Sequence, residues 1–157
     1  CAPIQHAAIE AYRRGPAIES YLGASRRVVR GLGQWVFRQL QSAGADVHEP
    51  EGGFYLFPDF SRQREAIQTR HGVVDSAQFC ERLLSDTGVA ILPGSCFGRD
   101  PAELTVRLAF VDFDGRRAIE AAQKWVPIDE NWLREHCGRT VTAIERMAGW
   151  VAENGTS

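Results

Sequence analysis

Arg107 is the residue whose type and position point most clearly to chemistry in this sequence. It lies in segment 105–110, TVRLAF, where strand alternation places a guanidinium among residues typical of a buried strand. A guanidinium there needs an anion, and its planar fork suits a carboxylate held through two hydrogen bonds. From spacing alone, that anion is either an internal carboxylate, such as Asp59 or Glu103, or the carboxylate of a bound ligand.

The other reactive residue types lack the spacing of a catalytic site. Gly94, Ser95 and Gly98 resemble an anion-binding loop only loosely, because neither a lysine nor a helix start follows them at phosphate-binding spacing. His136 and Cys137 are neighbours on a predicted helix and point about 100° apart, so they do not pair as base and nucleophile. The sequence predicts a glycine turn, a partly exposed histidine and a core cysteine at these positions.

Charge and cysteine content narrow the class of protein. Eighteen basic residues stand against twenty acidic ones, for a net charge of -2, which leaves no broad cationic face for nucleic acid or an anionic membrane. No apolar run approaches the ~20 residues of a membrane span. The four cysteines form no CxxC pair, and the histidines show no metal-ligand spacing. We expect a reduced cytoplasmic protein that holds no metal and contacts neither nucleic acid nor membrane.

Helical periodicity dominates the first part of the chain. An opening helix is predicted from Pro3 to Arg14, and a long helix with a broad apolar face from Pro16 to Gly44. Gly31 and Gly33 each cost such a helix up to ~1 kcal/mol relative to alanine, which predicts a bend or a close neighbour there. The long helix would position the elements that follow.

Short strands are predicted in the middle of the chain. The predicted strands are 45–48, 53–57, 89–92 and 104–111, and the predicted loops are 61–72, which holds a helical piece, and 93–98. The first two strands would form a hairpin. Tyr55 alternates with aromatic neighbours on the second strand, so at least one face of that strand is core. Asp75 is predicted to cap a helix that ends at Gly88, with Gln78 in a capping box.

Two further helices, 114–125 and 129–154, are predicted to close the chain. No internal repeat or linker divides it, so residues 1–157 are expected to form a single domain. The pattern predicts an α+β fold: a small mixed or antiparallel sheet of three to four strands, with helices mainly on one face and a long helix before it.

Five segments in order resemble the C-terminal part of one enzyme family. They are APIQ at 2–5, GGFYLFPD at 52–59, FCERLL at 79–84, GVAILPGS at 88–95 and VRLAF at 106–110. Together they resemble the C-terminal small domain of class I/II pyridoxal-phosphate aminotransferases of the aspartate-aminotransferase-like fold type I. The resemblance spans about residues 2–120, and the helix from 129 onward is less typical of the family.

The resemblance implies roles for two residues. Arg107 would be the small-domain arginine that grips the α-carboxylate of an amino or 2-keto acid, which favours a ligand as its anion. Tyr55 would lie near the substrate side chain, and loop 93–97 near the face where the domains close. Holding the carboxylate would orient the Cα–H bond against the cofactor ring. We therefore expect Arg107 to be partly exposed at a concave surface, with no internal ion pair.

The resemblance also implies parts that this sequence lacks. Pyridoxal 5′-phosphate would be held by a large domain upstream of Cys1, in a homodimeric full-length enzyme, and the present chain alone would be inactive. Its single lysine, Lys124, matches no cofactor-binding position and is expected on a solvated helix face. One apolar face of helix 16–44 or of the opening segment should then be under-covered. The alternatives are a stand-alone amino-acid-binding module and a structural domain in which Arg107 is internally paired.

Overall fold

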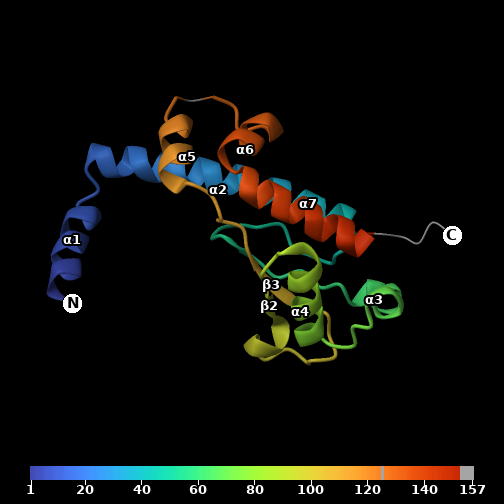
Figure 1. Cartoon of the computed structure of the whole chain (residues 1–157). Coiled ribbons are helices and arrows are strands. Elements are labelled where there is room, and N and C mark those ends of the chain that lie inside the picture. The colour runs from blue at the N-terminus through green and yellow to red at the C-terminus, as the bar shows by residue number, and fades with distance from the viewer. Residues whose placement is uncertain (125, 153–157) are drawn as a thin grey trace.

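A computed structural model describes residues 1–124 and 126–152 of the chain, and Figure 1 shows how its elements are arranged. The α-helices are α1 (Ala2–Tyr12), α2 (Pro16–Ser42), α3 (Arg64–His71), α4 (Ser76–Thr87), α5 (Gly115–Ala122), α6 (Glu130–His136) and α7 (Gly138–Ala152). The strands are β1 (Tyr55–Leu56), β2 (Leu92–Pro93) and β3 (Val106–Ala109), and the short 3-10 helices are η1 (Ser61–Gln63) and η2 (Gly94–Phe97).

Helix α2 is the scaffold of the core, and both predicted N-terminal helices are confirmed. Pro16 occupies its first turn, where a missing N–H costs little. Its buried row is Ala24, Val28, Leu32, Gly33, Trp35, Val36 and Leu40. The close neighbours predicted at its glycines are present, because a Cβ on Gly31 would lie 2.7 Å from Ile128 Cγ2 and one on Gly33 would lie 3.1 Å from Phe110 Cζ. Glycine there lets distant segments approach the helix backbone.

Three short strands form one antiparallel sheet in the order β1-β3-β2. Tyr55 pairs with Ala109, and Leu92 pairs with Arg107. The inner face of the sheet carries Leu56, Val106 and Leu108, which join the same apolar core as α2 and α4. The opposite face is open, so the helices cover mainly one side of the sheet. This arrangement confirms the predicted α+β class.

The predicted hairpin between 45–48 and 53–57 is wrong. One isolated antiparallel bridge joins Asp46 to Asp59, and β1 pairs with the distant β3 instead. Strand β3 lies between β1 and β2 and pairs the backbone groups along both of its edges. If β1 paired with 45–48 in a local hairpin instead, the edge of β3 that faces β1 would have no partner. The predicted strand 89–92 is also shorter than expected, because only Leu92 belongs to β2.

Two predicted loops are largely helical. Segment 61–72 forms η1 and α3, which buries Ile67 completely and ends at Gly72 with a φ of 69°. Ile67 is the one buried residue of α3, and a single apolar residue in a polar stretch does not produce a helical hydrophobic pattern. Segment 93–98 forms the end of β2 and then η2, which ends at Gly98 with a φ of 80°. The αL conformation at both glycines is one that other residues adopt only with strain.

Side-chain caps define several helix ends. Asp75 accepts a hydrogen bond from the Gln78 N–H at 2.8 Å, and Gly88 ends α4 at a φ of 75°, as predicted. The predicted single helix 129–154 is instead two helices, because the backbone of Cys137 leaves the helical region with φ -126° and ψ 23°. The far end of that prediction, at Asn154, lies outside the described residues. Helix α5 ends at Ala122, before the end predicted for helix 114–125, so Lys124 lies in a turn beyond the helix and not on its face.

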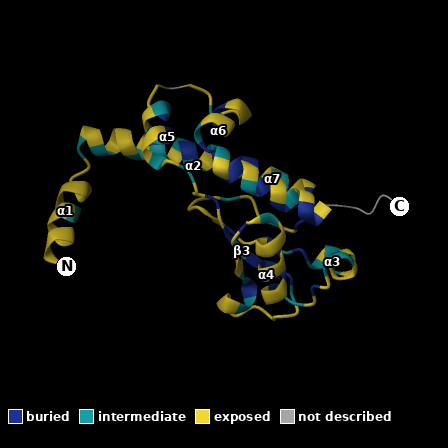
Figure 2. Ribbon diagram, viewed as in Figure 1, coloured by how far each residue is buried: buried dark blue, intermediate teal, exposed yellow. Residues whose placement is uncertain are grey.

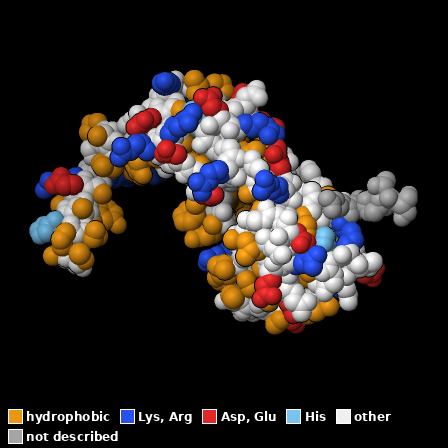
Figure 3. Space-filling view, in the orientation of Figure 1, with side chains coloured by type: hydrophobic (Ala, Val, Ile, Leu, Met, Phe, Trp, Pro, Cys, Tyr) orange, Lys and Arg blue, Asp and Glu red, His pale blue; other side chains and the backbone are white. Residues whose placement is uncertain are grey.

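Helix α1 has no buried residue and projects from the body of the fold (Figures 1 and 2). Ile4 is 68% exposed and Tyr12 is 85% exposed. Figure 3 shows hydrophobic side chains gathered on this helix, with open space between it and the sheet. The under-covered apolar face expected near the N-terminus is therefore present. Within residues 1–124 and 126–152, no helix is both long and apolar enough to cross a lipid bilayer.

Candidate functional site

The open face of the sheet carries the candidate site, with Arg107 on the central strand. Arg107 is half-buried, while its strand neighbours Val106 and Leu108 point into the core. The guanidinium carbon lies 4.7 Å from the centre of the Tyr55 ring and 4.4 Å from the centre of the Phe97 ring. Because β1 and β2 flank β3, the two rings belong to chain segments at opposite edges of that strand.

Neither internal carboxylate weighed from the sequence is the partner of Arg107. The Asp59 carboxylate accepts a hydrogen bond from the Ser61 N–H at 2.7 Å, and Glu103 pairs with Arg99 at 2.7 Å. Across residues 1–124 and 126–152, no carboxylate oxygen lies within 4.0 Å of the Arg107 nitrogens, and no hydrogen bond uses its N–H groups. The contacts of the guanidinium are the two aromatic rings.

The Arg107 guanidinium, with its charge and its N–H donors, therefore lies on an exposed apolar surface. The same region exposes Tyr55, Phe57, Leu92, Phe97 and Val111. An aromatic face attracts the cation without accepting its in-plane N–H groups, so all five donors of the guanidinium stay available. A carboxylate placed edge-on to the guanidinium can accept two parallel hydrogen bonds. The site can thus bind and orient a carboxylate.

Arg107 does not line the cavity of about 480 Å³ beside α2. That cavity is lined by Ser25, Arg26, Val29, Arg30, Pro50, Glu51, Gly52, Gly53, Phe54 and Phe110. Arg107 lies instead on the open face of the sheet. Its predicted partial exposure is confirmed, and its placement at a concave surface stays a prediction.

Phe97 is the contact that the sequence did not predict. It ends η2, a segment expected to be a loop near the face where the domains close, and no contact with Arg107 was predicted for it. The only signal for it was an aromatic residue followed directly by Gly98, whose αL conformation turns the chain back toward the sheet. Tyr55, by contrast, lies on the open face and beside Arg107, as the aromatic strand pattern allowed.

The other reactive residues do not form a catalytic group. Burial raises the pKa of the Cys80 thiol to about 12 and that of Cys137 to about 12, so neither is a thiolate at neutral pH. Lys124 is exposed just beyond α5. In the described part of the chain, no three His, Cys, Asp or Glu side chains are grouped to hold a metal ion.

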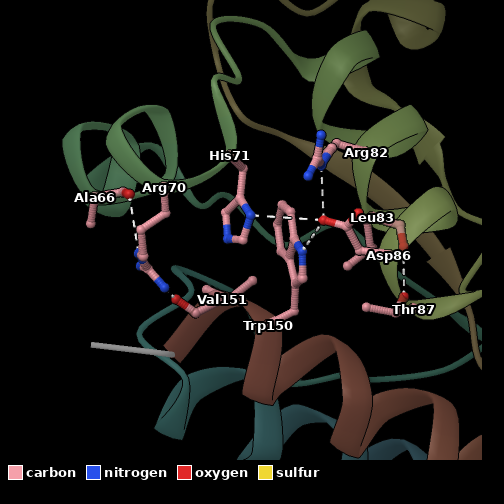
Figure 4. Close-up of polar contacts among 9 residues, drawn as sticks. All are labelled: Ala66, Arg70, His71, Arg82, Leu83, Asp86, Thr87, Trp150 and Val151. Atoms are coloured by element: carbon pink, nitrogen blue, oxygen red, sulfur yellow. Dashed lines mark hydrogen bonds and ion pairs between the residues drawn. The ribbon is translucent and has the colours of Figure 1, made fainter. Parts of the chain in front are cut away.

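A second polar cluster ties α7 to α3 and α4 (Figure 4). Trp150 donates a hydrogen bond from Nε1 to Asp86 Oδ2 at 2.9 Å, and its ring stacks on His71 with centroids 3.8 Å apart. Arg82 also binds Asp86, at 2.9 Å. Hydrogen bonds from Trp150 and Arg82 lower the pKa of Asp86, and burial together with the charge of Arg70 lowers the pKa of His71. The cluster favours a charged Asp86 and a neutral His71, as expected of a structural contact.

Known proteins with related sequences are aminotransferases. The chain is 36% identical over 107 residues to an aspartate aminotransferase of Bacillus sp. (strain YM-2), covering 68% of this chain and 25% of that protein. It is 33% identical over 95 residues to the mitochondrial alanine aminotransferase of Saccharomyces cerevisiae, covering 59% of this chain and 15% of that protein. The chain therefore spans a quarter or less of these relatives.

A solved structure shares the fold. The aspartate aminotransferase of Thermotoga maritima aligns with a TM-score of 0.52 and 26% identity, over 94% of this chain and 28% of that one. The family model for aminotransferase class I and II matches residues 1–119, which include the sheet, both aromatic contacts and Arg107, and exclude α6 and α7. This chain belongs to the aminotransferase class I and II family.

Proposed function

We propose that residues 1–157 are the C-terminal small domain of a pyridoxal-phosphate-dependent aminotransferase and bind the α-carboxylate of its amino acid and 2-keto acid substrates. Arg107 is the carboxylate-binding residue, and Tyr55 lies beside the substrate side chain. The observation that carries the proposal is a half-buried guanidinium with no internal anion in the described structure. A guanidinium that no carboxylate of the chain occupies is free to receive one from a ligand.

Family membership and the short span of the match support the small-domain assignment. The matched relatives are four or more times longer than the aligned region, which leaves room for a separate large domain. The exposed apolar residues of α1 suit a helix that is covered by another domain or subunit. We infer that a large domain and a second copy of the enzyme complete the site, and that this chain alone does not transfer amino groups.

The described residues do not themselves form a site for pyridoxal phosphate, which the family implies. The sole lysine of the chain, Lys124, is exposed. The short 3-10 helix η2, which carries no lysine, follows β2. The cofactor would therefore be held by residues outside this chain. The contribution of Arg107 is to fix the substrate carboxylate through two hydrogen bonds, which restricts rotation of the rest of the substrate.

The proposal is tested first by the reading frame upstream of Cys1, which should encode a large domain that carries a lysine. In the enzyme so defined, Arg107→Lys should lower kcat/KM by at least about tenfold, because an ammonium cannot reproduce the bidentate fork. Arg99→Lys is the matched control, since Arg99 is an exposed arginine in an ordinary surface pair with Glu103.

Unchanged kcat/KM in Arg107→Lys would refute the assignment of Arg107. A reading frame with no upstream domain, together with amino acid binding by this chain, would favour a stand-alone binding module instead. Loss of activity in the Arg99→Lys control to the same extent would show that the effect is not specific to Arg107, because both changes keep the positive charge and remove only the planar fork.

A further inference from the structure

We propose that Phe97 is a positioning residue, whose ring holds the Arg107 guanidinium in the orientation that receives a carboxylate. The inference rests on the proposed function of Arg107 and adds a residue to it. Phe97 would touch the arginine and leave the substrate to Arg107. Phe97 ends η2, which directly follows β2, whereas Tyr55 belongs to β1 on the other edge of β3.

The contact geometry of Arg107 is that of a cation held between two aromatic rings. The guanidinium carbon is 4.4 Å from the Phe97 ring centre and 4.7 Å from the Tyr55 ring centre, both well inside the ~6 Å range of cation–π attraction. Phe97 is in turn fixed by Phe57, whose ring meets it edge-on with centroids 5.9 Å apart and planes at 85°. Phe97 therefore has a defined orientation although it is 42% exposed.

The backbone under Phe97 is anchored to the same strand that carries Arg107. At the start of η2, the Gly94 N–H donates to the Thr105 carbonyl at 2.7 Å, and a Cβ on Gly94 would lie 2.9 Å from Thr105 Cβ. At its end, the Arg99 N–H donates to the Gly94 carbonyl at 3.2 Å and closes the turn. Thr105 directly precedes β3, so these contacts tie η2, and with it Phe97, to the start of the strand that carries Arg107.

An aromatic contact suits a ligand-binding arginine better than an internal carboxylate would. An ion pair would hold the side chain but would occupy its donors and neutralise its charge. A ring removes rotamer freedom from the arginine while it leaves the charge and all N–H groups available to a ligand. The Arg107 side chain then loses its conformational entropy when the chain folds, so binding a ligand does not carry that entropy cost a second time.

The test uses nuclear magnetic resonance of the 157-residue chain and follows the Nε–Hε signal of Arg107. Ring currents should shift Hε upfield relative to the exposed arginines, and Nε should be more rigid than theirs. Phe97→Leu should remove about half of the shift, because one of two rings is lost. Leu92→Ala is the matched control: it removes apolar surface from the cross-strand neighbour of Arg107 without removing a ring. Phe97→Tyr should restore the wild-type signal.

Titration with pyruvate, a 2-keto acid, then measures what the orientation contributes to binding. The Kd of Phe97→Leu should rise about three- to fivefold, or ~0.6–1 kcal/mol, while Leu92→Ala and Phe97→Tyr stay near wild type. The urea midpoint of each variant shows whether the fold is intact.

Each outcome of the titration has a separate meaning. Pyruvate binding with an equal Kd in wild type and Phe97→Leu overturns the positioning role. An unshifted Hε in the wild type overturns the ring contact itself. No response of the Arg107 signal to pyruvate in any of the proteins overturns a role for Phe97 in binding by this chain. The proposed function of Arg107 is overturned separately, by unchanged kcat/KM in Arg107→Lys of the full-length enzyme.

Discussion

Trp150 provides the sharpest test of how α7 is attached to the rest of the fold. Its ring is 6% exposed, stacks on His71 and meets Phe79 edge-on at 5.3 Å, while its Nε1 donates to Asp86 at 2.9 Å. Trp150→Ala removes the whole ring from this contact and should lower the free energy of unfolding by ~3–5 kcal/mol. Trp150→Phe keeps most of the ring and loses the donor, which should cost about 1 kcal/mol.

Trp132 is a matched control for the hydrogen bond. It is 8% exposed, and in the described structure its Nε1 is buried with no partner. Trp132→Phe removes a donor that makes no hydrogen bond, so it should cost less than Trp150→Phe although both changes remove the same atoms. The two substitutions thus separate the loss of a bond from the loss of ring volume.

Urea unfolding followed by far-ultraviolet circular dichroism at pH 8 gives these free energies, and it avoids the fluorescence change caused by removing one of four tryptophans. Equal costs for Trp150→Phe and Trp132→Phe would refute the hydrogen bond to Asp86. A cost below about 1 kcal/mol for Trp150→Ala would refute the packing of α7 against α3 and α4.

The remaining predictions concern pH and self-association. The pKa of His71 is lowered in the folded chain, so the unfolded state takes up a proton more readily. The contribution of His71 to the free energy of unfolding should therefore be complete above about pH 6.5 and should decrease at lower pH. The urea midpoint of His71→Phe should change less between pH 8 and 5 than that of the wild type, and an equal change would contradict the assignment. The exposed apolar side chains of α1 should cause concentration-dependent association in sedimentation, which Ile4→Gln with Ile9→Gln should reduce, whereas monomer at every concentration would count against an uncovered docking face.

Elements set by local interactions were predictable from the sequence. Helix α4 is an example, because the Asp75 cap, the apolar spacing and the terminal Gly88 all act within one short segment. Helix α2 is another, since a row of buried residues at four-residue spacing needs only one apolar partner surface. In both helices the observed ends lie within two residues of the expected ones.

Elements set by distant partners were predicted less well. The sequence between Asp46 and Asp59 does not indicate that β1 pairs with β3, about fifty residues away. A local hairpin partner and a distant strand would form hydrogen bonds with the same backbone groups of β1. The break at Cys137 was missed for a similar reason. Apolar spacing continues across it, with buried residues on both α6 and α7, so the sequence pattern gave no sign of the change in backbone angles at Cys137.

The surroundings of Arg107 depend on both kinds of information. Strand alternation indicated that a charged residue would stand among apolar ones, and this was sufficient to select Arg107. The rings that hold it come from β1 and from the turn after β2, two segments about forty residues apart that meet only because β3 pairs with both. A guanidinium held by rings alone retains its charge and its donors, so the open face of the sheet can receive a carboxylate there. That availability, independent of the likeness to aminotransferases, is the physical reason to expect a carboxylate at this position.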